Sequence, residues 1–188
     1  LLTADNSVIA LGRDGNPLWT AKLPTPGIGA PVLNAAGEIY ILDSTATLYV
    51  LTPQGDLAWA LGLEGVGAPL APPTVDAAGV AYFATEFSLA AVGPGGQLRW
   101  RTSLPTYSYV APQPTLSPDE SLLFFEDIAV STATGDTVYD ATDTILDRYV
   151  VGADGKLYIA AQDGVTRADI TPEGMTLTPQ ATFDILSL

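Results

Sequence analysis

Carboxylates are the side chains of this sequence with the greatest capacity for chemistry. The chain of 188 residues contains 21 Asp and Glu and 7 Lys and Arg, but it contains no His and no Cys. Their absence excludes Ser-His-Asp and Cys-His nucleophile systems, thiolate metal sites and His-ligated metals. The sequence also lacks the phosphate-cradling motif Gly-x₄-Gly-Lys-Ser/Thr. A reaction or a metal site in this chain would therefore depend on oxygen ligands.

The densest group of carboxylates lies in the C-terminal part of the chain, at Asp136, Asp140, Asp143 and Asp147. Oxygen ligands on a loop suit calcium, so these four residues are calcium candidates. Their spacing matches neither an EF-hand nor a Gly-x-Asp repeat, and a solvated acidic loop is the simpler interpretation. A glycosidase pair would need two acids facing each other across a pocket, which a sequence does not show. We therefore expect no catalytic residues and no bound metal.

The overall charge limits the partners of the chain. A net charge of −14 opposes binding to a phosphate backbone, so we expect no nucleic-acid partner. The sequence contains no polybasic segment for an anionic membrane and no apolar run long enough to span one, so we expect no membrane insertion. The first residues lack the basic and apolar regions of a signal peptide. The missing initial Met suggests a processed or trimmed chain in which such a signal would be lost.

The elements expected to position these residues are short β-strands. Apolar runs rich in β-branched and aromatic residues alternate with turn clusters every eight to twelve residues, which is typical of an all-β fold. Four such strands with short turns make one propeller blade. We predict a single β-propeller domain over residues 1–188. Its expected parts are a partial blade at 1–23, blades at about 30–63, 72–104, 112–140 and 148–179, and a spare strand at 183–188.

A ten-residue phrase recurs about every forty residues and supports this fold. A small or branched apolar residue is followed five residues later by Gly and then by Trp, as in Ala10–Trp19, Val50–Trp59 and Ala91–Trp100. Two longer copies end at Tyr139 and Thr178. The turn glycines are Gly15, Gly55, Gly96, Gly135 and Gly174, and they are 40, 41, 39 and 39 residues apart. A period of this length in a strand-rich chain is typical of propellers.

The repeated residues are expected to be structural. Glycine supplies the positive φ that a tight hairpin requires, which applies to Gly15, Gly55, Gly96 and Gly135. The large aromatic side chains are expected to pack between neighbouring blades; they are Trp19, Trp59, Trp100 and Tyr139. Tryptophans could also serve as ligand-stacking platforms, but the regular spacing favours packing.

The sequence leaves the number of blades open. The segment 183–188 could pair with the partial blade at the N-terminus and close a five-bladed ring. The repeat that runs from Ala168 through the C-terminus and on from the N-terminus to Ala10 would then span only about 30 residues, fewer than the other repeats. A fragment of a six- to eight-bladed propeller is therefore the slightly favoured alternative.

The phrase Ala-x₄-Gly-x₃-Trp resembles the tryptophan-docking repeat of the pyrroloquinoline-quinone (PQQ) propellers and covers nearly the whole chain. That family contains quinoprotein dehydrogenases and cofactor-free relatives, such as the lipoprotein scaffold of the outer-membrane β-barrel assembly machinery. The quinoprotein enzymes of that family use a vicinal cysteine disulfide, a calcium ion and a catalytic aspartate, so the resemblance implies these groups for an enzyme of this type. This chain has no cysteine and too few blades for the enzyme ring, so it is similar to the non-enzymatic branch, without a cofactor.

The resulting expectation is a non-catalytic propeller scaffold with protein partners, either extracellular, periplasmic or at the cell surface, or an accessory subunit of a larger assembly. Tyr107, Tyr109 and Phe87 are the candidates for partner contact, because exposed aromatic residues on loops bury much area at little entropic cost. They could equally fill space between blades. The alternative function is a small-ligand-binding, hydrolytic or quinoprotein-type propeller that uses carboxylates, with calcium, at its central axis.

Overall fold

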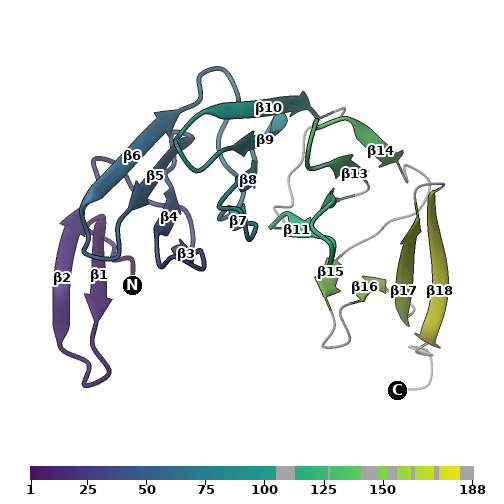
Figure 1. The fold of residues 1–188 in the computed structure, drawn as a ribbon, viewed down its shortest axis with the longest axis horizontal. Helices are drawn as coiled ribbons and strands as arrows, with labels where there is room; N and C mark the ends of the chain where they lie inside the picture. The colour runs from purple at the N-terminus through teal and green to yellow at the C-terminus, as the bar shows by residue number, and fades with distance from the viewer. Residues whose placement is uncertain are drawn as a thin grey trace. The chain divides into compact units, whose positions relative to one another are not determined.

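The computed structural model describes residues 1–104, 113–126, 128–140, 148–151, 156–161, 164–171 and 174–182. All regular elements in these residues are β-strands, and every strand pairing is antiparallel (Figure 1). This architecture confirms the predicted all-β fold. The described residues contain no helix long and apolar enough to cross a membrane.

The chain divides into two compact units, Leu1–Gln113 and Pro114–Leu188, which are described separately. The predicted limits of the single domain and of its blades stay predictions, and the predicted spare strand at 183–188 lies outside the described residues.

The first unit contains one two-stranded sheet and two four-stranded sheets, in which sequential strands are neighbours. The two-stranded sheet consists of β1 (Ser7–Leu11) and β2 (Pro17–Lys22). The next consists of β3 (Val32–Leu33), β4 (Ile39–Leu42), β5 (Thr47–Leu51) and β6 (Leu57–Gly62). The third consists of β7 (Thr74–Val75), β8 (Ala81–Ala84), β9 (Ser88–Val92) and β10 (Leu98–Ser103).

The second unit contains two four-stranded sheets of the same strand order. The first consists of β11 (Thr115–Leu116), β12 (Leu122–Phe125), β13 (Ile128–Ser131) and β14 (Thr137–Asp140). The other consists of β15 (Arg148–Val151), β16 (Leu157–Ala161), β17 (Gly164–Thr171) and β18 (Gly174–Thr182).

The core of the first unit lies between successive sheets, because their middle strands are apolar on both faces. The strands β4, β8 and β9 are buried throughout. One cluster joins the second and third sheets, with Tyr40, Leu48, Phe83 and Val92 among its members. A smaller cluster joins the two-stranded sheet to the second sheet through Val8 and Ile41. In contrast, the outer strands β2 and β6 alternate between exposed and half-buried positions.

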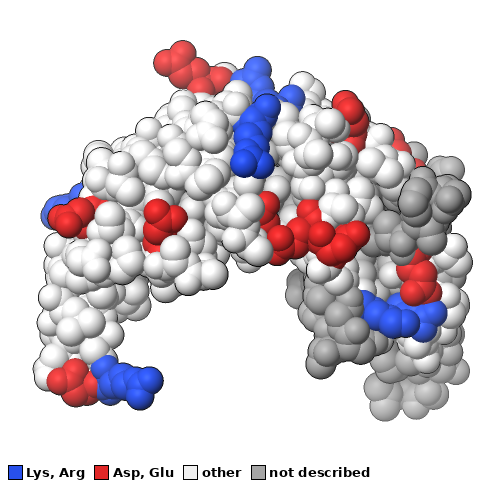
Figure 2. Space-filling model, viewed as in Figure 1, with Lys and Arg blue, Asp and Glu red and all other residues white. Residues whose placement is uncertain are grey.

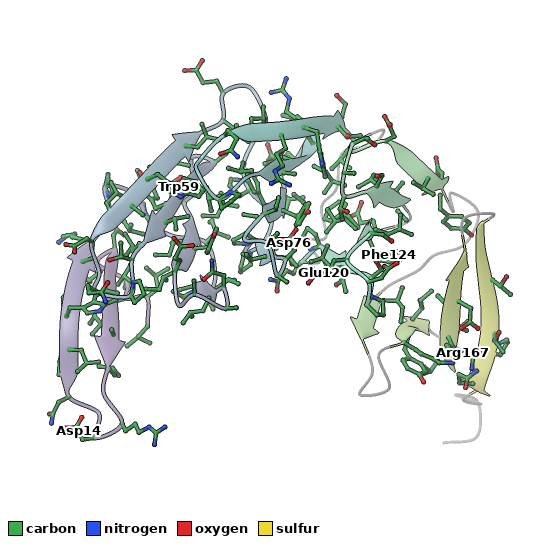
Figure 3. The ribbon with its side chains drawn as sticks, viewed as in Figure 1. Asp14, Trp59, Asp76, Glu120, Phe124 and Arg167 are labelled. Carbon is green, nitrogen blue, oxygen red and sulfur yellow. The ribbon has the colours of Figure 1, made fainter. Side chains whose placement is uncertain are left out.

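The core of the second unit follows the same plan. Phe124, Ala129, Leu157, Ile159 and Ala168 form its buried cluster, and Tyr139 packs against them (Figure 3). Both sheets of this unit contribute to the cluster.

The repeated phrase places its small residue opposite its aromatic residue in each hairpin. Ala10 pairs with Trp19, Val50 with Trp59, Ala91 with Trp100 and Ala129 with Tyr139. In these four hairpins the register shifts by one residue near the turn, which is the mark of a β-bulge. The glycines of their turns have positive φ, from +77° at Gly135 to +91° at Gly55.

The last repeat departs from this register. Ala168 pairs with Leu177 rather than with Thr178, which the sequence had aligned with the aromatic position. Its register shift lies instead between Val165 and Thr166, far from the turn. The pairing therefore continues unshifted to Thr171 and Gly174, and the partner of Ala168 falls one residue earlier.

Candidate functional site

The hairpin between β8 and β9 carries the aromatic residue Phe87, which is 50% exposed. The neighbouring connection between β6 and β7 holds this hairpin by hydrogen bonds. The Thr85 hydroxyl donates to the Val66 carbonyl at 2.6 Å, and the Glu86 amide donates to the Ala68 carbonyl at 2.9 Å. The Ala68 amide in turn donates to Glu86 Oε2 at 3.1 Å. These contacts fix the backbone on which Phe87 stands.

Gly67 lies directly against the Phe87 ring. A Cβ atom built on Gly67 would lie 2.8 Å from Phe87 Cδ2 and 2.8 Å from Glu86 Oε2. The glycine also has a φ of +80°, which side chains rarely adopt. The absence of a side chain at this position therefore allows the ring to lie against the connection while the rest of the ring stays exposed.

The Phe87 hairpin is also tied to the connection that follows β10. The Leu104 amide donates to the Phe87 carbonyl at 2.9 Å. Tyr107 and Tyr109, the other predicted contact residues, lie in this connection but outside the described residues. The assignment of Phe87, Tyr107 and Tyr109 to partner contact stays a prediction.

Trp19 and Trp59 lie against turn glycines of the next sheet. A Cβ on Gly55 would lie 2.6 Å from Trp19 Cδ2, and a Cβ on Gly96 would lie 2.9 Å from Trp59 Cε3. Each indole face is thus covered by a turn backbone. Trp100 is only 8% exposed, and its ring centroid lies 6.0 Å from that of Tyr82. This geometry supports packing between sheets as the role of Trp19 and Trp59.

The acidic residues that suggested calcium are only partly described. Asp136 and Asp140 are exposed on the β13–β14 hairpin, whereas Asp143 and Asp147 lie outside the described residues. Within the described ranges, no three Asp, Glu, His or Cys side chains are grouped so that they could hold a metal ion. Figure 2 shows Asp and Glu side chains at several places on one face, with few Lys and Arg. The calcium assignment stays a prediction.

A buried carboxylate ties the β4–β5 hairpin to the chain before it. Asp43 Oδ1 accepts hydrogen bonds from the Thr45 amide at 2.8 Å, the Thr45 hydroxyl at 2.8 Å and the Thr47 amide at 2.9 Å. Its Oδ2 accepts from the Thr25 hydroxyl. Burial acts to raise the pKa of Asp43, but these hydrogen bonds outweigh it, and the pKa lies below its ordinary value. The carboxylate therefore has a structural role: its hydrogen bonds join the β4–β5 hairpin to Thr25 in the preceding connection.

A second titratable group joins the second and third sheets. The Tyr40 hydroxyl donates to the Gly79 carbonyl at 3.1 Å and accepts from Asn34 Nδ2 at 3.4 Å. Burial, together with the nearby charge of Glu38, raises the pKa of Tyr40 to about 12. A phenol with this pKa stays protonated near neutral pH, so Tyr40 serves as a hydrogen-bond donor there.

Sequence reasoning did not find the residues of these links. Asp43 and Thr85 occupy the same hairpin position in consecutive sheets. Asp43 accepts a hydrogen bond from the connection that precedes its sheet, and Thr85 donates one to the connection that precedes its own sheet. A polar residue recurring directly after each second strand was the available signal in the sequence.

Comparisons with solved structures place the fold among propellers. Virginiamycin B lyase from Staphylococcus aureus is 19% identical, with a TM-score of 0.69 over 95% of this chain and 64% of that one. BamB from Moraxella catarrhalis is 16% identical, with a TM-score of 0.67 over 95% and 62%. A streptogramin B lyase structure is 18% identical, with a TM-score of 0.67 over 95% and 63%. The chain thus spans less than two thirds of the length of these proteins, and at these identities the likeness shows the fold alone.

Sequence comparison identifies the family. No curated protein significantly matches the sequence. The family model described as "Outer membrane protein assembly factor BamB" matches residues 1–171, which is most of the chain, and it confirms the PQQ-type repeat indicated by the Ala-x₄-Gly-x₃-Trp phrase. The chain belongs to the family of the outer membrane protein assembly factor BamB.

Proposed function

We infer that this chain is a non-catalytic β-propeller scaffold for protein–protein interaction in the cell envelope. The observation that carries this proposal is membership of the family of an outer membrane assembly factor. A protein with that role works by contacts with other proteins, and the same membership supports the proposed cell-envelope location, periplasmic or at the cell surface. The finer roles, as an extracellular module or an accessory subunit of a larger assembly, belong to the same proposal.

The Phe87 hairpin supports this proposal as a contact surface. The ring is half exposed on a backbone fixed by three hydrogen bonds to the preceding connection. A rigid aromatic side chain loses little conformational entropy on binding, and such residues frequently dominate interface energetics. Tyr107 and Tyr109 follow Leu104 in the sequence, outside the described residues, and remain candidates for partner contact.

An experiment with a photo-crosslinking amino acid tests this surface. The residue replaces Phe87, and the matched control carries it at Leu57, which is 58% exposed on the outer strand β6. We expect a discrete protein adduct in cell-envelope extract for position 87 and none for position 57. We also expect that the unlabelled Phe87→Ala chain, added as a competitor, reduces formation of this adduct only weakly. Equal labelling at both positions would contradict the assignment of Phe87.

Calcium titration tests the competing function, a ligand-binding or hydrolytic propeller that uses carboxylates. The scaffold proposal expects the same melting temperature with calcium and with a chelator. A calcium-dependent rise in melting temperature that disappears in Asp136→Asn/Asp140→Asn would favour a metal site instead, because a ligand that binds only the folded state stabilises it.

A further inference from the structure

The outer strand β10 of the third sheet carries two arginines in a strongly acidic chain. Arg99 and Arg101 are both exposed, whereas Trp100 between them is buried. The two arginines therefore project away from the buried indole, with their Cα atoms about 7 Å apart along the strand. Figure 2 shows Lys and Arg side chains gathered over this strand. β10 thus presents local positive charge on a chain whose net charge is −14.

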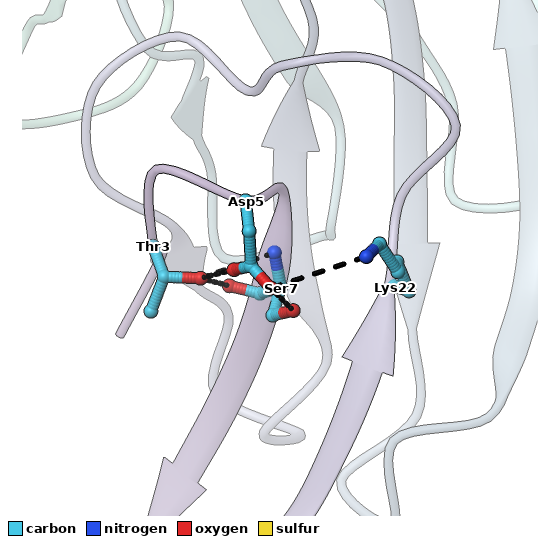
Figure 4. Close-up of polar contacts among 4 residues, drawn as sticks. All are labelled: Thr3, Asp5, Ser7 and Lys22. Atoms are coloured by element: carbon cyan, nitrogen blue, oxygen red, sulfur yellow. Dashed lines mark hydrogen bonds and ion pairs between the residues drawn. The ribbon is translucent and has the colours of Figure 1, made fainter.

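The cation of another outer strand already has a carboxylate partner. Lys22 Nζ on β2 lies 3.9 Å from Asp5 Oδ2, and the Ser7 hydroxyl donates to the same oxygen at 3.1 Å (Figure 4). In contrast, no carboxylate of the described residues lies within ion-pair distance of Arg99 or Arg101. The two guanidinium groups therefore carry charge that no described side chain neutralises.

Both arginine side chains lie against backbone. Arg101 Nη1 donates to the Glu64 carbonyl at 3.4 Å, in the connection between β6 and β7. A Cβ atom built on Gly93 would lie 3.1 Å from Arg99 Nε, so the Arg99 side chain lies against the β9–β10 turn. A guanidinium group has five N–H donors, so a single hydrogen bond leaves most of its donors able to bind a carboxylate. The two groups are therefore partly ordered before any ligand binds.

The arginines continue the surface that begins at Phe87. The Phe87 ring lies against Gly67, and Arg101 reaches Glu64 in the same connection between β6 and β7. The Leu104 amide donates to the Phe87 carbonyl. Arg101 precedes Leu104 by three residues, which is about 10 Å of extended chain. One short segment of a ligand can therefore contact the aromatic ring and both arginines.

We propose that Arg99 and Arg101 bind the carboxylates of an acidic, extended segment of a partner protein, and that an apolar side chain of the same segment contacts Phe87. Guanidinium groups bind carboxylates through paired N–H bonds, which add geometric specificity to the charge attraction. Acidic residues at alternate positions of an extended segment match two arginines that are two residues apart on a strand. The inference rests on the proposed scaffold role and names the charge of the segment that the scaffold accepts.

The distribution of charge favours a short protein segment over a lipid surface. An anionic membrane is negative over a whole face, so it would meet acidic side chains as well as the arginines. Glu64 adjoins Arg101, and Glu86 adjoins Phe87, and the net charge of −14 adds to this repulsion. A segment of a few residues meets the arginines and the ring alone.

The test uses the full chain and a synthetic peptide, Ser-Glu-Ser-Glu-Ser-Ser-Leu-Ser, blocked at both ends. We expect saturable binding by calorimetry at low ionic strength, and we expect added salt to weaken it. Arg99→Gln/Arg101→Gln should weaken binding by about 10-fold or more, because it removes both charge-assisted contacts. The matched control, Arg13→Gln/Lys22→Gln, removes the same amount of charge from the first unit and should leave binding unchanged.

Charge reversal provides a second variant in case the neutral one aggregates. Arg99→Glu/Arg101→Glu keeps charged residues on the outer strand, and charged residues on an edge strand protect it from pairing with other chains. We expect this variant to remain folded, as melting curves verify, and to bind no peptide.

Three results would overturn the inference: no binding of the peptide to the unchanged chain, equal binding of a peptide with Gln in place of Glu, or equal weakening by the two double Gln variants. Sedimentation with vesicles of phosphatidylcholine and phosphatidylglycerol that requires the arginines would assign them to lipid headgroups instead. A concentration-dependent dimer that the charge reversal abolishes would assign them to a second copy. The crosslinker at Phe87 reports contact with a partner of any charge, so failure of the peptide leaves the test of the scaffold role intact.

Discussion

The two junctions between consecutive sheets of the first unit use the same repeat residues but different polar links. We call the contact of the β1–β2 sheet with the β3–β6 sheet the first junction, and the contact of β3–β6 with β7–β10 the second. In the first junction Trp19 Nε1 donates to the Pro53 carbonyl at 2.9 Å. In the second junction Trp59 Nε1 is buried and has no acceptor among the described residues.

At the second junction a tyrosine, Tyr40, both contacts the tryptophan and donates the hydrogen bond to the next sheet. The Tyr40 ring lies edge-on to Trp59, with centroids 6.2 Å apart and planes at 83°, and the Tyr40 hydroxyl reaches Gly79 in the next sheet. The first junction instead has the bond from Thr25 to the carboxylate of Asp43. The repeat thus specifies the apolar contact of Trp with Gly, while polar residues outside the repeat set how each junction responds to mutation and pH.

The largest expected effect comes from adding a methyl group where Trp19 meets Gly55. Gly55→Ala forces Ala to a φ near +91° and places Cβ 2.6 Å from the indole. A left-handed residue costs roughly 1–2 kcal/mol, and overpacking costs roughly 1–3 kcal/mol more. We expect the free energy of unfolding in urea to fall by about 3 kcal/mol.

Gly15→Ala is the matched control for this change. Gly15 has the same turn position and a φ of +80°, but a Cβ there meets no atom within 4 Å. Only the backbone term applies, so we expect a loss of about 1 kcal/mol. Equal losses for Gly15→Ala and Gly55→Ala would show that the contact of Trp19 with Gly55 contributes nothing beyond turn geometry.

Alkaline pH should weaken the second junction more than the first. The folded-state pKa of Tyr40 is raised to about 12, so its contribution to stability is complete below the unfolded pKa of about 10 and is lost as pH rises towards 12. We expect a loss of the order of 1–2 kcal/mol in urea unfolding over this range. In Tyr40→Phe this part of the pH dependence should disappear; an unchanged alkaline profile would contradict the role of the phenol.

The sequence was sufficient to predict the strands and the Trp–Gly spacing, because both depend on local pattern. The positions of Trp19 and Gly55 are readable from the forty-residue period. The bond from Trp19 to Pro53 and the unbonded Nε1 of Trp59 are not, because the turn next to each Trp has Pro at the same position, Pro53 and Pro94.

Replacing each indole by a phenyl ring measures the difference in hydrogen bonding. Trp19→Phe loses a bond whose net contribution is about 1 kcal/mol, as well as some ring contact. Trp59→Phe loses similar contact but also removes a buried N–H without an acceptor, which costs the folded state about 1–3 kcal/mol. We therefore expect Trp59→Phe to be less destabilising by about 1–2 kcal/mol in urea unfolding. The opposite order would mean that the indole N–H of Trp59 has an effective acceptor.

Acid should weaken the first junction, and this is the smallest of the four changes in stability that we predict. The pKa of Asp43 is lowered in the folded state, so its contribution is present above the unfolded pKa of about 4 and is lost as pH falls through the folded value. The second junction has a hydroxyl at the equivalent position, Thr85, which does not titrate there. The measurement is the difference in stability between the unchanged chain and Asp43→Asn from pH 6 to pH 2. We expect this difference to shrink as pH falls, and Thr85→Ser, the matched control at the second junction, should show a difference that does not depend on pH. A constant difference for Asp43→Asn would mean that Asp43 has the same pKa in the folded and the unfolded chain, and that the two junctions do not differ in their response to acid.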